Sequence, residues 1–305
     1  RHTRSLCDWS SDVCSSDLNQ LWSRQENGTW LEDGLLSGLG VDQDGQEQAG
    51  MGIAVAGLDS RGGLDLAVTN FERESINLYQ NQENGLFQDI ASGTGLAATT
   101  RSSLGWGIGI ADFNLDQSPD LLISNGHVYP QADSAEVSPG YSQLDQLFLG
   151  SRTSGGGIAF SEQKSQIENQ TPHVGRGLLL ADLDRDGDVD AITSTINGPP
   201  HIYRNNTNPR QSEEHQSVAI CLSQSGANPQ ALGSTIRILD TNPAAEYPVL
   251  RNTSFQSSGL AEVILPLPMN QASPRVQVKW PDGSRENFLL SGDTVLLQKG
   301  LGQNP

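Results

Sequence analysis

Cysteine is scarce in this sequence, and its distribution excludes a disulfide framework. Two of the three cysteines, Cys7 and Cys14, lie in the segment CDWSSDVCSSDL (7–18). That segment matches, in frame, the translation of a common sequencing adapter, so we expect residues 1–18 to be a disordered artefact. Only Cys221 then remains, in a strand-like pattern where we expect a buried small hydrophobe. The chain would be a fragment whose signal peptide is not observable.

Basic residues are also few. The 305-residue chain has 18 Lys and Arg against 36 Asp and Glu, a formal net charge of -18 and a pI of about 4.5. Nucleic acids and anionic membranes attract Lys and Arg, so the composition argues against both as partners. No run approaches the roughly eighteen apolar residues that a membrane-spanning helix needs. The composition is typical of a protein that gathers cations or stays soluble outside cells.

Familiar catalytic signatures are missing as well. The sequence contains no G-x-S-x-G, Walker A or H-E-x-x-H pattern. The segment NGHVYP (125–130) gives the one local hint of a site, and we interpret His127 as a turn residue whose ring nitrogens are hydrogen-bonded. We interpret Trp106 as a core residue rather than a platform for a sugar. We therefore expect no catalysis.

What the sequence does contain is a repeat. Three segments align without gaps, namely MGIAVAGLDSRGGLDLAVTN (51–70), WGIGIADFNLDQSPDLLISN (106–125) and RGLLLADLDRDGDVDAITST (176–195). Each has Gly at its second position and Asp at its fifteenth, and each predicts a strand, a tight acidic loop and a second strand.

Further short β-type runs follow each copy. They lie at 76–81 and 84–90, at 146–150 and 156–162, and at 201–206. Four short strands per unit is typical of a propeller blade. Residues 19–34 resemble the back half of a further unit.

The loop of the third copy predicts a metal site. Five aspartates alternate along it: Asp182, Asp184, Asp186, Asp188 and Asp190. Alternate carboxylates on a tight loop can converge on a hard cation that accepts six to eight oxygens, so we predict bound Ca²⁺. We expect Asp188 to offer its backbone carbonyl while its side chain faces water. An EF-hand is excluded because the twelfth loop position is Thr193 instead of Glu, and strands flank the loop.

The second and first loops depart from this pattern. The second loop offers Asp112, Asn114, Asp116 and Asp120. We expect it to bind Ca²⁺ less well, since Gln117 stands where the third loop has glycine. The first loop keeps Asp59 and Asp65 but has Arg61 at a ligand position. There we predict no metal, and an internal salt bridge from Arg61 to Asp59 or Asp65.

These copies resemble the FG-GAP (VCBS-type) repeat, whose core is roughly A-D-x-[DN]-x-D-G-x-x-D. That family builds β-propellers with Ca²⁺ in the blade loops. The resemblance implies an all-β fold in which residues 19–210 form a partial propeller of about three and a half blades. A complete propeller of this family holds about seven, so we expect a truncated chain with open sheet edges.

Residues 211–305 have another character. RVQVKWPDGSRENFLL (275–290) predicts a hairpin with a Pro-Asp-Gly turn. Together with ALGSTIRI (231–238) and SSGL (257–260), it resembles the ASPIC/UnbV domain that follows FG-GAP repeats in the cartilage acidic protein-like family. The resemblance implies a small β-rich domain and assigns it no biochemical activity.

Three functions are compatible with these features. The first is a secreted or cell-surface, calcium-binding interaction or adhesion module, monomeric apart from its open blade edges, with a protein or glycan ligand. The second is a structural spacer of a larger surface protein. The third is a propeller lyase or hydrolase with its site at the axis, since propellers host catalysis as well as binding. The absence of catalytic motifs favours the first.

Overall fold

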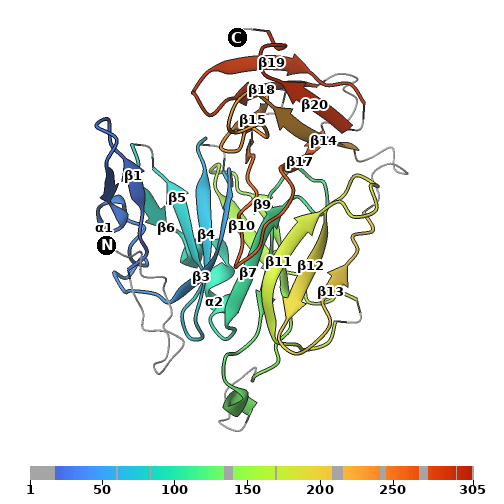
Figure 1. Ribbon diagram of the computed structural model, residues 1–305. Helices are drawn as coiled ribbons and strands as arrows, with labels where there is room; N and C mark the ends of the chain where they lie inside the picture. The colour runs from blue at the N-terminus through green and yellow to red at the C-terminus, as the bar shows by residue number, and fades with distance from the viewer. Residues whose placement is uncertain are drawn as a thin grey trace.

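The fold is built almost entirely of strands, as predicted. The computed structural model describes residues 18–59, 61–82, 84–133, 140–168, 170–207, 216–240, 245–267, 274–292 and 294–303. Within these residues the strands form six sheets, and the few helices are short (Figure 1). None of these helices has the length and apolar character needed to cross a membrane. Residues 1–17 of the predicted artefact, and the predicted boundary at 210, lie outside the described residues.

The three sequence copies form three antiparallel sheets, which we call blades one to three. Blade one has the strand order β3 (Gly50–Ala56), β4 (Asp65–Asn70), β5 (Asn77–Asn81) and β6 (Phe87–Asp89). Blade two repeats it with β7 (Gly105–Ala111), β8 (Asp120–Asn125), β9 (Gln146–Arg152) and β10 (Ile158–Glu162). Blade three has β11 (Gly175–Ala181), β12 (Asp190–Thr195) and β13 (His201–Tyr203). The predicted strands are therefore present, and β13 is the outer edge of blade three.

Short elements precede and connect the blades. The hairpin β1 (Trp22–Arg24) and β2 (Trp30–Glu32) is followed by α1 (Gly34–Ser37) and supplies the predicted half unit. The connection between blades one and two holds η1 (Ala91–Thr94) and α2 (Leu96–Thr100), and η2 (Pro130–Asp133) lies between β8 and β9 within blade two. In Figure 1 the blades stand side by side, with β3, β7 and β11 facing a common centre.

The glycine at the second position of each copy explains how closely these inner strands approach. A Cβ atom on Gly52 would lie 2.1 Å from the carbonyl oxygen of Trp106 on β7. A Cβ atom on Gly107 would lie 2.7 Å from the carbonyl oxygen of Arg176 on β11. Any side chain at these positions would separate the blades, so the repeated glycine is a packing requirement.

Four apolar clusters lie within the described residues, and two of them are large. The first joins blades one and two and includes Leu78, Ile108 and Phe148, all fully buried. The second belongs to the C-terminal part and surrounds Trp280, which is 1% exposed. Burying such side chains stabilises each by about 2 kcal/mol.

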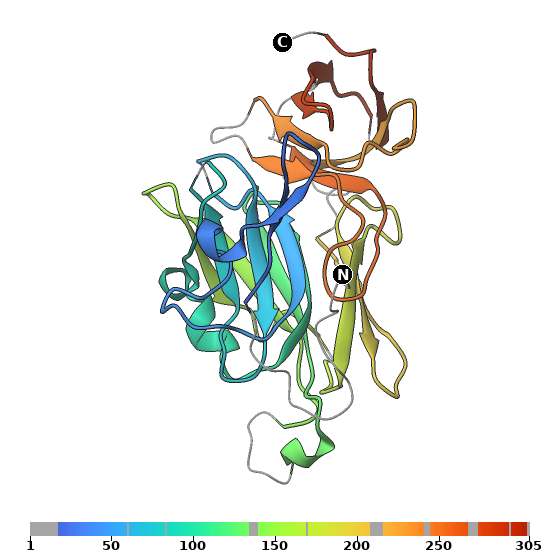
Figure 2. The same ribbon diagram turned by 60° about the vertical axis from the view of Figure 1, so that its left-hand side comes forward.

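The C-terminal part consists of two packed sheets. One has the order β17 (Glu262–Leu267), β14 (Gln216–Ser223), β20 (Thr294–Gln298). The other has the order β16 (Glu246–Pro248), β15 (Thr235–Ile238), β18 (Arg275–Lys279), β19 (Arg285–Leu289). The predicted 275–290 hairpin is the β18–β19 pair. Between β16 and β17 the chain leaves this part and descends among the blades (Figures 1 and 2).

Candidate metal centres

The fifteenth residue of each copy, an aspartate, ties each acidic loop to its blade. In blade three, Asp190 Oδ2 accepts a hydrogen bond from Leu183 N at 2.8 Å, and its Oδ1 accepts one from Asn205 N at 2.7 Å. Asp65 and Asp120 make the same pair of backbone contacts in blades one and two, at 2.8 to 2.9 Å. These carboxylates therefore hold the loop backbone in place through hydrogen bonds within the chain.

The seventh residue closes the loop in blades two and three. Asp182 accepts hydrogen bonds from Asp186 N and Gly187 N at 3.1 and 3.0 Å. Asp112 accepts the equivalent bonds from Asp116 N and Gln117 N at 3.0 and 2.6 Å. Because both carboxylates turn inward to meet the loop backbone, their charges lie beside those of the other aspartates.

The third loop gathers three carboxylates into one cluster. Asp182, Asp184 and Asp190 each offer an oxygen, and these oxygens lie within 4.8 Å of one another. No other group of three His, Cys, Asp or Glu residues in the described part of the chain meets this distance. The spacing fits a hard cation, whose oxygen ligands lie about 2.3–2.6 Å from the ion. Three of the five predicted ligands therefore converge.

The expectation for Asp188 was wrong. Its side chain is 0% exposed, so it does not face water. The start of β14 packs against this part of the loop, and Ser217 Oγ donates a hydrogen bond to the carbonyl of Gly187. A residue far along the chain therefore covers the turn, which the local sequence pattern does not reveal.

Arg204 is a charge partner of the third loop that the sequence analysis missed. Its Nε lies 2.5 Å from Asp184 Oδ2, and its Nη2 lies 3.7 Å from Asp186 Oδ2. It directly follows β13, the strand that pairs with β12. The sequence position of Arg204 could have indicated this role, because it is equivalent to that of Gln80 in blade one. Gln80 donates a hydrogen bond to Asp59 of its own acidic loop. Arg204 partly offsets the repulsion among the loop aspartates.

In the second loop the carboxylates of Asp112 and Asp120 are both buried. Burial, followed by the charges of Asp120 and Asp116, raises the pKa of Asp112 to about 8. Burial likewise raises the pKa of Asp120 to about 7, against three backbone hydrogen bonds that lower it. Carboxylates with raised pKa values hold protons near neutral pH. A cation that binds them would displace these protons, because metal ligands must be deprotonated. Asp116 is exposed and Asn114 Nδ2 donates to it at 3.0 Å, so these two predicted ligands turn toward each other.

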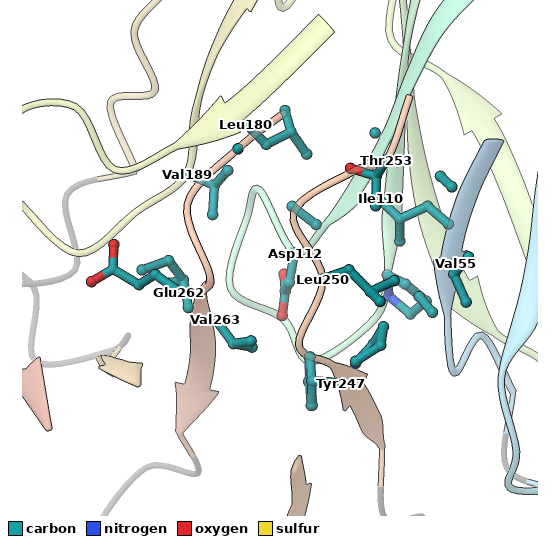
Figure 3. A pocket seen from close by; sticks show the side chains of 18 of the residues that line it. Val55, Ile110, Asp112, Leu180, Val189, Tyr247, Leu250, Thr253, Glu262 and Val263 are labelled. Carbon is teal, nitrogen blue, oxygen red and sulfur yellow. The ribbon is translucent and has the colours of Figure 1, made fainter. Parts of the chain in front are cut away.

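A cavity beside Asp112 explains part of this desolvation. It has a volume of about 190 Å³ and lies where the inner strands meet residues 245–250 and 260–264. Figure 3 shows Asp112 facing the side chains of Tyr247, Leu250 and Val263 across it. Apolar neighbours disfavour the charged form of a carboxylate, consistent with the raised pKa.

The first loop contains an internal ion pair. Arg61 Nε lies 3.7 Å from Asp59 Oδ2, which confirms the predicted internal salt bridge. Burial, with a further contribution from Asp59, raises the pKa of Asp65 to about 6. Gln80 also donates a hydrogen bond to Asp59, so the chain itself provides the partners of this loop.

The residues outside the loops have structural surroundings. His127 Nε2 lies 3.0 Å from Glu72 Oε2 and its Nδ1 accepts from Tyr129 N at 3.0 Å, as the interpretation of a hydrogen-bonded turn required. Trp106 is 4% exposed and its Nε1 donates to the carbonyl of Gly126 at 2.7 Å, which confirms a core role. Cys221 is half-buried rather than buried, and burial, followed by the charge of Glu262, raises its pKa.

Comparison with known proteins agrees with this architecture. A family model described as FG-GAP-like repeat matches residues 57–123, from the first acidic loop into β8. The chain is also 26% identical over 180 residues to Cartilage acidic protein 1 of Xenopus tropicalis. That alignment covers 59% of this chain and 24% of the relative, so the match spans about a quarter of that protein. Both matches confirm the predicted resemblance to FG-GAP-repeat proteins of the cartilage acidic protein type.

Proposed function

We propose that this chain, an FG-GAP-repeat protein of the cartilage acidic protein type, is a calcium-stabilised interaction module that works outside the cell. The observation that carries the proposal is the cluster of Asp182, Asp184 and Asp190. These residues would hold Ca²⁺ in the third loop, and Asp112 and Asp120 would hold a weaker ion in the second. The ion would neutralise the negative charge of the loop aspartates, which Arg204 offsets only in part in the third loop.

Calcium would act here on stability rather than on catalysis. The third loop joins β11 to β12, and its aspartates already bind the loop backbone. An ion that neutralises their mutual repulsion would add its binding free energy to the folding free energy of blade three. Extracellular calcium is sufficient for a site in the 10⁻⁴–10⁻³ M range typical of extracellular modules.

Net charge and the matched proteins support the proposed ligand class. A chain of net charge -18 suits a protein or glycan partner with basic or calcium-bridging groups. The matched family is described as an FG-GAP-like repeat and the relative is named Cartilage acidic protein 1, and neither description names an enzyme, which supports binding over catalysis. The structural spacer remains the second candidate, and it predicts calcium-dependent stability without any partner.

Calcium-dependent unfolding tests the proposal directly. We expect millimolar Ca²⁺ to raise the thermal midpoint of the full chain by several degrees relative to chelator. Asp184→Asn should remove most of that increase, because it deletes one ligand charge at nearly constant shape. Asp44→Asn, at an exposed acidic turn outside the three loops, is the matched control and should leave the increase intact.

The outcome separates the alternatives. An equal midpoint with Ca²⁺ and with chelator would mean that the loops are solvated acidic turns, and the calcium part of the proposal would fall. If calcium stabilises the parent and the Asp44→Asn variant but not the Asp184→Asn variant, the third loop is the metal site. A glycan and protein array probed with and without calcium then distinguishes an interaction module from a spacer.

A further inference from the structure

The segment between β16 and β17 forms a small closed loop, residues 251–259, which we call the axial loop. Its two ends are joined, since Gly259 N donates to the carbonyl of Arg251 at 2.8 Å and Arg251 Nε donates to the carbonyl of Gly259 at 3.0 Å. Figures 1 and 2 show the segment leaving the C-terminal sheets and passing down between blades one and three, in front of β7. The loop therefore belongs to the C-terminal part in sequence and to the propeller in space.

The tip of the axial loop pairs with the innermost strand of blade one. Ser254 N donates to the carbonyl of Ile53 at 2.6 Å, and Ile53 N donates back to the carbonyl of Ser254 at 3.5 Å, forming an isolated antiparallel bridge. Ser254 Oγ also accepts a hydrogen bond from Ile108 N on β7 at 3.0 Å. One residue thus satisfies backbone groups on the inner strands of two blades.

The next residue packs against blade two. The ring of Phe255 lies edge-on to Trp106, with ring centroids 4.7 Å apart. The guanidinium of Arg176 lies 4.1 Å from the centroid of the same tryptophan ring. Trp106 is therefore held between a residue of blade three and a residue of the axial loop.

The repeated glycines show what position the loop occupies. Gly52 of blade one faces the carbonyl of Trp106, and Gly107 of blade two faces the carbonyl of Arg176, each residue lying one position before the glycine of the following blade. Gly177 of blade three has no such blade strand beside it within the described residues. A Cβ atom there would lie 3.2 Å from the carbonyl oxygen of Phe255 and 2.8 Å from Ser257 Oγ.

The backbone of the loop is strained to reach this position. Ser254 and Gln256 have φ of 72° and 45°, in the left-handed region that residues with a Cβ atom rarely adopt. Such conformations persist where surrounding contacts impose them. Here the bridge to Ile53 and the packing against Trp106 are the imposing contacts.

We propose that the axial loop closes the partial propeller by standing in for the inner strand of a following blade. Its Phe255 meets Gly177 as Trp106 meets Gly52 and as Arg176 meets Gly107. From there Ser254 returns to Ile53, so the contacts run from blade one through blades two and three and back to blade one. The C-terminal part therefore protects the inner strands of the propeller as well as carrying its own core.

Hydrogen exchange on the full chain tests this proposal. Phe255→Ala should accelerate amide exchange in 50–56 and 105–111 by about tenfold or more, since it frees the loop tip and permits local opening. Exchange in the β18–β19 hairpin, 275–289, should stay unchanged because that core does not contact the loop tip. Gly177→Ala should act in the same direction, and Gly155→Ala is its control because nothing lies within 4 Å of a Cβ atom there.

A variant that is expected to stabilise the axial loop shows whether the faster exchange comes from the loop or from a general loss of folding. Gln256→Gly relieves a left-handed residue and should slow exchange in the same two strands. The proposal is overturned if the ratio of exchange rates between the inner strands and the 275–289 hairpin does not change in Phe255→Ala and Gly177→Ala. It is also overturned if Gln256→Gly accelerates exchange in the inner strands.

Discussion

At the residue scale, single aspartates in these repeats perform two tasks. The fifteenth aspartate of each copy anchors the loop backbone and at the same time contributes charge to the loop. In blade three the guanidinium of Arg204 forms a salt bridge with Asp184 of the loop. In blade two burial raises the pKa of Asp112. The same sequence position is thus structural in every copy, and its capacity to bind metal depends on its neighbours.

Arg204 and a cation compete for the same carboxylates. Arg204→Gln removes the contact at 2.5 Å to Asp184, so the calcium-free protein should unfold at a lower temperature. The same variant should bind Ca²⁺ several-fold more tightly, because the ion no longer displaces an arginine. Calorimetric titration measures the affinity, and Arg275→Gln is the control, since its partner Asp240 lies in the C-terminal part. Unchanged calcium affinity in Arg204→Gln would contradict competition.

Gln117 occupies a position that favours glycine. Its φ is 69°, and the equivalent Gly187 has a φ of 97°. Gln117→Gly should raise the free energy of unfolding by about 0.5–1 kcal/mol in urea, since it removes left-handed strain. Gln166→Gly, in a turn without positive φ, should lower it instead. A loss of stability in Gln117→Gly would show that the glutamine side chain contributes more than the strain costs.

At the scale of elements, the local sequence pattern predicts several strands and contacts. Other features depend on packing between segments that are distant in the chain, so the pattern does not predict them. The third strands, the 275–290 hairpin and the Arg61 salt bridge all follow from short stretches of sequence. The burial of Asp188 and the position of the axial loop do not, because each is decided by a segment distant in the chain. A periodic pattern specifies which face a residue prefers, and only the packed fold specifies what covers it.

The second loop gives the molecule a pH dependence of definite sign. Its two buried carboxylates have raised pKa values of about 8 and about 7, against 3.8 for an ordinary aspartate. The native state then holds protons that the unfolded chain has lost, so these groups lower the calcium-free stability as pH rises from about 4 to about 8.

Comparing the parent with Asp112→Asn isolates this effect. The difference in thermal midpoint, variant minus parent, should increase with pH in chelator. Saturating Ca²⁺ should reverse the trend of the parent, since the ion binds the deprotonated carboxylates. A pH-independent difference in chelator would mean that Asp112 titrates as an ordinary surface aspartate.

At the scale of the whole molecule, the C-terminal core and the core of blades one and two are separate and are connected by a smaller set of contacts. The C-terminal core around Trp280 shares no residue with the core of blades one and two. Coupling comes from backbone bridges, glycine contacts and one aromatic pair. Because the two cores are separate, the two parts are expected to differ in stability.

The bridge between Ile53 and Ser254 also sets an order of events during synthesis. A ribosome makes all three blades before it makes the residue that returns to the first of them. Until then the nascent chain presents unpaired inner-strand amides and carbonyls, a surface that chaperones recognise and that neighbouring chains can pair with. Contacts between residues so distant in sequence form slowly. Closure of the propeller therefore waits for the arrival of a short turn, and any delay in translating the C-terminal part prolongs the time in which the chain can aggregate.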